Sequence, residues 1–150
     1  MLLHVFVSDD QAVVKKNTGM EGIKIIGTRE LSEYSFVRSL YKKYAHINMD
    51  HFRWSMKPVL ASYLLRNGYE KVVYTDCDMF FVNNYDFLLN ELNDWAVLLT
   101  PHWKNTDPLI DKESFLSNFT SGIFSAGFFA ANPEGLPALD WWAHACHFMM

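Results

Sequence analysis

One short run of residues limits the folds that this chain can adopt. Residues 71–82 are mostly apolar, β-branched or aromatic, a composition that favours a buried strand, yet Asp76 and Asp78 interrupt the run one residue apart. Strand side chains alternate with period 2, so both carboxylates would point to the same side if the run stays extended. Two acids at the end of a buried strand need compensation, which a divalent cation provides. A solvated turn after the strand is the alternative.

The rest of the chain alternates strand and helix patterns. Besides the run before Asp76, we expect strands over residues 2–7, 23–26, 95–99 and 123–131. Helices are expected over 11–17, capped by Asp9 and Asp10, and over 32–45, 55–67, 86–92 and from 137 onward. Residues 104–122 have no clear periodicity and are expected to form a loop that is functional or mobile.

This alternation predicts an α/β fold with a mostly parallel sheet flanked by helices. In such sheets, ligands bind beyond the carboxyl ends of the strands. Asp76 and Asp78 follow a strand directly, so they would lie at such an end. Carboxylate oxygens suit a hard ion, and we therefore expect Mn²⁺ or Mg²⁺ rather than zinc.

Size and charge exclude several classes of protein. The 150 residues predict a single domain spanning 1–150. A formal net charge of -4 without a basic stripe argues against a nucleic-acid partner. No apolar stretch reaches the ~20 residues that span a bilayer, and the start lacks the features of a signal peptide. Cys77 and Cys146 make no disulfide framework, so we expect a cytoplasmic protein with reduced thiols, or one peripheral to the inner face of the membrane.

Three common catalytic motifs are missing from the sequence. It contains no G-x-x-x-x-G-K-[ST] phosphate loop, no G-x-G-x-x-G dinucleotide fingerprint and no G-x-S-x-G nucleophile elbow. A metal-dependent reaction of a phosphorylated ligand remains.

The sequence resembles a known family of enzymes. Asp76-Cys77-Asp78, after an apolar strand, resembles the D-x-D signature of nucleotide-sugar-dependent glycosyltransferases with the Rossmann-like GT-A fold, related to family 8 of bacterial type. Segments 54–58, 64–69, 100–103, 124–132 and 139–142 resemble segments on either side of that signature, so the likeness runs over nearly the whole chain. Relatives extend beyond both ends of it, so we expect an incomplete GT-A domain, truncated at both ends.

The resemblance implies roles for the metal site. Asp78 would coordinate the divalent ion that bridges the donor diphosphate, and Asp76 would contact that metal or the ribose and sugar of the donor. Cys77 lies between them in the donor site. The metal would offset the charge that builds on the leaving nucleoside diphosphate.

Four further positions match the family's donor site or its surroundings. Lys57 falls where relatives carry a cation near the donor phosphates, with an ordinary surface charge as the alternative. Ser125 and Gly127 lie in the segment that lines the sugar pocket, although Ser125 replaces a more usual Asn. His102 is a candidate ligand or base, and a loop histidine is the alternative.

The activity implied is transfer of a hexose from a nucleoside-diphosphate sugar, a UDP-sugar in particular, to a glycan or to a lipid-linked acceptor of lipopolysaccharide type. Two alternatives stay open: a non-catalytic remnant or interaction module on the same scaffold, and a D-x-D phosphatase. The phosphatase is less favoured, because such enzymes carry a polar residue soon after the second Asp, whereas Met79-Phe80-Phe81 follows here. Exposed aromatics would favour a homo-oligomer.

Overall fold

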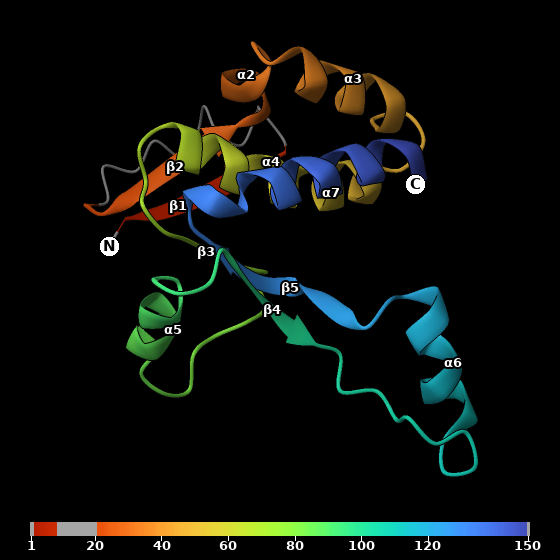
Figure 1. Cartoon of the computed structure of the whole chain (residues 1–150). Helices are drawn as coiled ribbons and strands as arrows, with labels where there is room; N and C mark the ends of the chain where they lie inside the picture. The colour runs from red at the N-terminus through yellow and green to blue at the C-terminus, as the bar shows by residue number, and fades with distance from the viewer. Residues whose placement is uncertain (1, 9–20, 150) are drawn as a thin grey trace. The chain divides into compact units, whose positions relative to one another are not determined.

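The computed structural model describes residues 2–8 and 21–149 (Figure 1). The chain divides into two compact units, each with its own sheet: unit 1 comprises Met1–Leu60 and Asp140–Met150, and unit 2 comprises Ala61–Leu139. The helix predicted over 11–17 and its cap at Asp9 and Asp10 lie outside the described residues. No helix in the described ranges is long and apolar enough to span a bilayer.

Unit 1 contains a two-stranded parallel sheet, as predicted for this part of the chain. Strands β1 (Leu3–Val7) and β2 (Ile23–Gly27) pair with Val5 opposite Ile25. The predicted helix over 32–45 is confirmed as α3 (Ser35–Tyr44), and a short helix that was not predicted, α2 (Thr28–Leu31), precedes it. The first part of α4 (Met49–Arg66) and most of α7 (Leu136–Met149) complete the unit. Its core is apolar and includes Ile26, Leu31, Val37, Leu40, Phe52, Met56 and Ala143.

Polar contacts join α3 to α7 in unit 1. The buried Tyr44 hydroxyl donates a hydrogen bond to the Cys146 carbonyl oxygen at 2.6 Å, and the Lys43 ammonium donates to the His147 carbonyl oxygen. The His144 ring packs on Phe36 with 4.7 Å between centroids. The two hydrogen bonds satisfy carbonyl groups near the end of α7 that have no partner within the helix.

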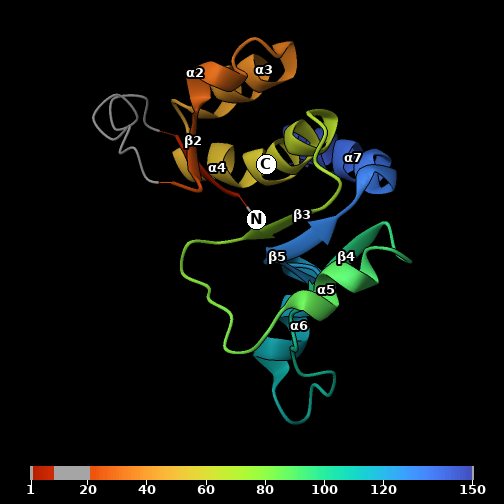
Figure 2. The same ribbon diagram turned by 90° about the vertical axis from the view of Figure 1, so that its left-hand side faces the viewer.

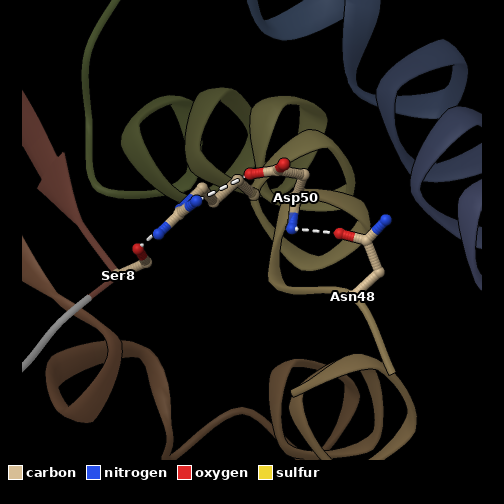
Figure 3. A network of polar contacts seen from close by, with 4 residues as sticks. Ser8, Asn48 and Asp50 are labelled. Atoms are coloured by element: carbon tan, nitrogen blue, oxygen red, sulfur yellow. Dashed lines mark hydrogen bonds and ion pairs between the residues drawn. The ribbon is translucent and has the colours of Figure 1, made fainter. Parts of the chain in front are cut away.

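A polar network surrounds the start of α4 (Figure 3). The Asn48 side chain accepts a hydrogen bond from the Asp50 N–H at 2.9 Å, and Arg53 contacts both Asp50 (2.6 Å) and the Ser8 hydroxyl (3.0 Å). The helix therefore starts before Ser55, although the sequence pattern predicted a start at Ser55. Ser55 is not a cap: its hydroxyl donates back to the His51 carbonyl oxygen at 2.7 Å, a contact made within helices.

One further feature of α4, the place of its proline, differs from the prediction, and another, its end, agrees with it. Pro58 would lie in the first turn of a helix that began at residue 55, but it lies inside α4, where its missing N–H removes one hydrogen bond. Gly68 ends the helix as predicted. Its φ of 93° is readily adopted only by glycine, and the N–H groups of Gly68 and Tyr69 donate to the carbonyls of Leu65 and Leu64.

Unit 2 contains a three-stranded sheet with the order β3–β5–β4 (Figures 1 and 2). The strands are β3 (Val72–Thr75), β4 (Val97–Pro101) and β5 (Phe124–Ala131). Both pairings are antiparallel, so the expectation of a mostly parallel sheet is wrong for this unit. Strands β3 and β4 run in the same direction, but β5 inserts between them in the opposite one. Apolar runs such as 128–131 indicate a buried strand without indicating its direction.

Residues 104–122 are not all loop. Helix α6 (Lys112–Thr120) lies between β4 and β5, and the Asp111 side chain caps it by accepting a hydrogen bond from the Ser114 N–H at 3.0 Å. None of its residues is buried, which explains why the segment lacks an apolar period. Helix α5 (Asp86–Glu91) agrees closely with the helix predicted over 86–92, and a short 3₁₀ turn (Pro133–Gly135) follows β5.

Candidate functional site

Asp76 lies at the end of β3, beside the middle of β5. The last regular pair of the two strands is Thr75 with Phe128, and the Asp76 N–H then donates to the Gly127 carbonyl oxygen at 2.8 Å. This bond extends the ladder by one residue and fixes the Asp76 backbone against β5. The antiparallel register, rather than a shared carboxyl edge of parallel strands, therefore brings Asp76 next to the predicted position Gly127.

The Asp76 carboxylate is held by a tyrosine of the same strand. The Tyr74 hydroxyl donates to Asp76 Oδ1 at 2.8 Å, and its ring stacks on Phe129 at 5.0 Å between centroids and 14° between planes. Burial raises the pKa of the Tyr74 phenol well above its usual range, and the hydrogen bond to Asp76 and the nearby negative charges raise it further. The hydroxyl thus stays protonated and remains a donor to the carboxylate.

Gly127 leaves a narrow space beside this carboxylate. A Cβ atom at position 127 would lie 3.2 Å from Asp76 Oδ2, 3.2 Å from the Met79 sulfur and 3.4 Å from the Ser125 hydroxyl oxygen. The Ser125 hydroxyl also accepts a hydrogen bond from the Gly127 N–H at 3.2 Å. Three residues singled out from the sequence, Asp76, Ser125 and Gly127, therefore surround one small space, together with Met79.

Cys77 and Asp78 leave the strand and are exposed. The Met79 N–H donates to the Asp76 carbonyl oxygen at 3.2 Å, so the chain turns over residues 76–79. The run does not stay extended, and the period-2 argument that placed both carboxylates on one side does not apply to Asp78. Asp76 is half-buried and hydrogen-bonded, whereas the Asp78 carboxylate is open to solvent.

These two carboxylates could supply the protein part of a site for a hard cation. Within the described residues, no group of three or more His, Cys, Asp or Glu side chains is placed to hold a metal ion. Mg²⁺ is commonly bound by one or two carboxylates together with substrate phosphates and water, so a cage made only of protein ligands is not required. Asp76 Oδ2, on the side of the Gly127 space, and the exposed Asp78 carboxylate are oxygen ligands of the right kind.

Two candidates remain, His102 and Lys57. His102 follows β4, on the opposite flank of β5 from β3, with its Nδ1 atom 2.9 Å from the Gly122 carbonyl oxygen. Its backbone N–H donates to the Ile123 carbonyl oxygen at 3.0 Å, which ties it to the start of β5. Lys57 belongs to unit 1, where it is only 8% exposed on α4, and its part in donor binding stays a prediction.

Sequence reasoning missed Tyr74 and Met79 as parts of the site. The period of 2 that was applied to Asp76 and Asp78 also places Tyr74 on the side of Asp76, so that signal was available. Met79 belongs to an apolar run in the sequence, which gives no sign of a site residue. It reaches the Gly127 space because of the turn at 76–79, which the pattern does not predict.

The fold is similar to that of a solved glycosyltransferase. The structure is similar to the crystal structure of mouse Xyloside xylosyltransferase 1 in its apo form, with a TM-score of 0.52 and 13% sequence identity. The likeness covers 96% of this chain and 57% of that protein, so the chain spans little more than half of the neighbour's length. No family model matches the sequence, and comparison with curated proteins gives no significant match.

Proposed function

We propose that this chain is a metal-dependent glycosyltransferase that moves a hexose from a nucleoside-diphosphate sugar to a glycan or lipopolysaccharide-type acceptor. The observation that carries the proposal is the pair of carboxylates at the end of β3, one of them fixed beside the Gly127 space and the other exposed. The similarity in fold to a xylosyltransferase supports a glycosyltransferase, and a cation held by these carboxylates would stabilise the nucleoside diphosphate as it leaves the sugar.

In this proposal each residue of the site binds or orients the donor. Asp78 and Asp76 hold Mn²⁺ or Mg²⁺, which offsets the charge on the leaving nucleoside diphosphate when bound. The Cys77 backbone lies between them on the turn. Ser125 presents its hydroxyl to the donor sugar, and Gly127 allows the sugar to come close to the backbone of β5.

Two residues have more peripheral roles in the proposal. Lys57 supplies a positive charge for the donor phosphates, and His102 acts as a ligand or a base. The acceptor is a glycan or a lipid-linked sugar, reached in the cytoplasm or at the inner face of the membrane. The similar mouse protein is named as a xylosyltransferase, so a xylose donor is tested beside the hexoses.

The test is calorimetric titration of the purified chain with UDP in the presence and absence of Mn²⁺. We expect binding that requires Mn²⁺ and that Asp78→Asn weakens by at least about tenfold, since the metal would lose a charged ligand. Asp94→Asn is the matched control. Asp94 is also exposed, but it lies just before β4, at the end of the sheet opposite to Gly127.

Turnover then separates the alternatives. UDP-glucose, UDP-galactose and UDP-xylose are incubated with the chain and Mn²⁺, and release of UDP is measured. Binding without release from any donor would favour the non-catalytic module on the same scaffold. Hydrolysis of a phosphomonoester without UDP binding would favour the phosphatase. Absence of Mn²⁺-dependent UDP binding in the folded chain would contradict the proposal.

A further inference from the structure

We propose that Tyr74 is a positioning residue, which fixes the orientation of the Asp76 carboxylate so that Oδ2 is directed to the metal and the donor. The inference rests on the proposed function, because it assumes that Asp76 is a ligand of the donor site. It assigns a role to a residue that would not itself touch the substrate.

The first step of the argument is that Tyr74 is rigid. Its ring stacks on Phe129, which is 1% exposed and lies opposite it in the β3–β5 register. Cross-strand aromatic pairs of this kind stabilise an antiparallel sheet. A hydroxyl carried by such a ring has a fixed position, so the hydrogen bond costs little side-chain entropy.

The second step is that Asp76 needs such a partner. The terminal torsion of an aspartate is broad, so a carboxylate at the end of a strand can rotate freely unless something holds it. The Tyr74 hydroxyl occupies Oδ1 at 2.8 Å, while Oδ2 lies toward the space beside Gly127. One oxygen is therefore an anchor, and the other is directed to the place where Ser125 and Met79 also lie.

The third step is the expected size of the effect. Hydrogen bonds that orient metal ligands typically change metal affinity by about 10–100-fold. Tyr74→Phe removes the hydroxyl and keeps the ring on Phe129. We therefore expect it to weaken Mn²⁺ binding in the presence of UDP by about tenfold, while the far-ultraviolet circular dichroism spectrum stays unchanged.

The experiment is a double-mutant cycle on the full chain. Binding of Mn²⁺ in the presence of saturating UDP is measured by the electron paramagnetic resonance signal of free Mn²⁺ for wild type, Tyr74→Phe, Asp76→Asn and the double variant. Tyr69→Phe is the matched control, because Tyr69 lies before β3, at the other end of that strand from Asp76. Asp76→Ser replaces Asp76→Asn if the latter does not fold.

The expected result is strong non-additivity: Tyr74→Phe weakens binding in the wild type and has no further effect once Asp76 is changed. A purely structural role for the hydroxyl would instead produce the same loss in both backgrounds, which would overturn the inference. Wild-type affinity in Tyr74→Phe, or an equal loss in Tyr69→Phe, would overturn it too. Failure of the wild type itself to bind Mn²⁺ and UDP would refute the proposed function, a result distinct from these.

Discussion

Asp76 and Asp78 are one residue apart but differ in how the chain holds them. The backbone of Asp76 is bonded to β5 and its carboxylate to Tyr74, whereas Asp78 lies on an exposed turn. A held carboxylate defines where a ligand binds, because its ordering cost has been paid during folding. An exposed one can adjust to the cation that it meets. The two residues thus suit different tasks in one site.

Two glycines, Gly127 and Gly135, differ in the atoms that an added methyl group would meet, and substitutions there can separate the binding site from the rest of the fold. At Gly127 the three atoms nearest to an added methyl group would all belong to side chains, namely Asp76 Oδ2, Met79 Sδ and Ser125 Oγ. We expect Gly127→Ala to fold with a small loss of stability, since these side chains can shift, but to weaken Mn²⁺-dependent UDP binding by displacing Asp76. Calorimetric titration measures this effect.

Gly135→Ala is the contrasting variant. Its methyl group would lie 2.5 Å from the Ala96 carbonyl oxygen and 2.8 Å from a Val97 methyl group, and a backbone atom cannot rotate away. We expect a loss of about 1–3 kcal/mol in the free energy of unfolding, measured with urea. UDP affinity should be unchanged in the folded fraction. The argument about Gly127 fails if Gly127→Ala binds UDP as the wild type does.

The raised pKa of Tyr74 makes stability depend on alkaline pH. The folded chain keeps this phenol protonated above its ordinary value of 10.0, whereas the unfolded chain releases the proton near that value. The stabilisation that the protonated phenol gives to the folded chain is therefore complete below about pH 10 and is lost as the pH rises further. Urea unfolding between pH 9 and pH 11 should show a steeper fall in stability for wild type than for Tyr74→Phe.

Cys146 provides the control for that experiment. Burial raises the pKa of its thiol above the ordinary value of 9.0, although the neighbouring Trp142 and Ser55 side chains oppose the shift. The stabilisation that the protonated thiol gives to the folded chain is likewise lost as the pH rises above about 9. The fall in the free energy of unfolding that is due to Cys146 should begin at a lower pH than the fall due to Tyr74. Cys146→Ala should remove this earlier part of the fall. Identical pH profiles for wild type and Tyr74→Phe would contradict the role given to the phenol.

At the scale of elements, β5 determines the geometry of the site. It lies between β3 and β4 and carries Ser125 and Gly127, so it supplies one wall of the space beside Asp76. The expectation of a mostly parallel sheet placed Asp76 at the end of a strand, but it did not predict which residue of another strand lies beside Asp76. The antiparallel insertion of β5 provides that neighbour.

Helix α6 has no buried residue, and polar contacts hold it in place. The Ser114 N–H donates to the Asp111 carboxylate at the cap, and Lys104 and Asn105 contact residues within the helix. Asp111→Ala should cost about 1 kcal/mol locally. Hydrogen exchange of the α6 amides should speed up while that of the β5 amides is unchanged. Lys112→Ala is the control, and equal exchange in both variants would contradict the argument.

The sequence predicted much of these elements, and its errors have physical causes. The apolar runs at β3, β4 and β5 and the stop at Gly68 are local signals, and all of them were confirmed. Helix α6 was missed because it has no buried face, and the start of α4 was missed because Ser55 bonds back within the helix. The pairing of β5 depends on contacts between distant segments, which periodicity does not contain.

At the scale of the whole molecule, fold and function rest on different amounts of sequence. The likeness to a glycosyltransferase covers nearly the entire chain at 13% identity, so it reflects the pattern of elements rather than particular side chains. The proposed activity depends on a few residues around the end of β3. Because a fold can host several functions, only ligand binding can connect the two.

Removal of the metal provides a test on the whole molecule. A ligand that binds only the folded chain stabilises it by about 2.7 kcal/mol at a hundredfold excess over its Kd, which raises the melting temperature of a chain of this size by several degrees. We expect Mn²⁺ with UDP to produce such a rise in differential scanning calorimetry, and EDTA to abolish it. Neither Mn²⁺ alone nor UDP alone should match the pair, because each ligand completes the coordination of the other. A rise of the same size in Asp78→Asn would mean that the pair binds at another place, and the carboxylates at the end of β3 would then have no part in it.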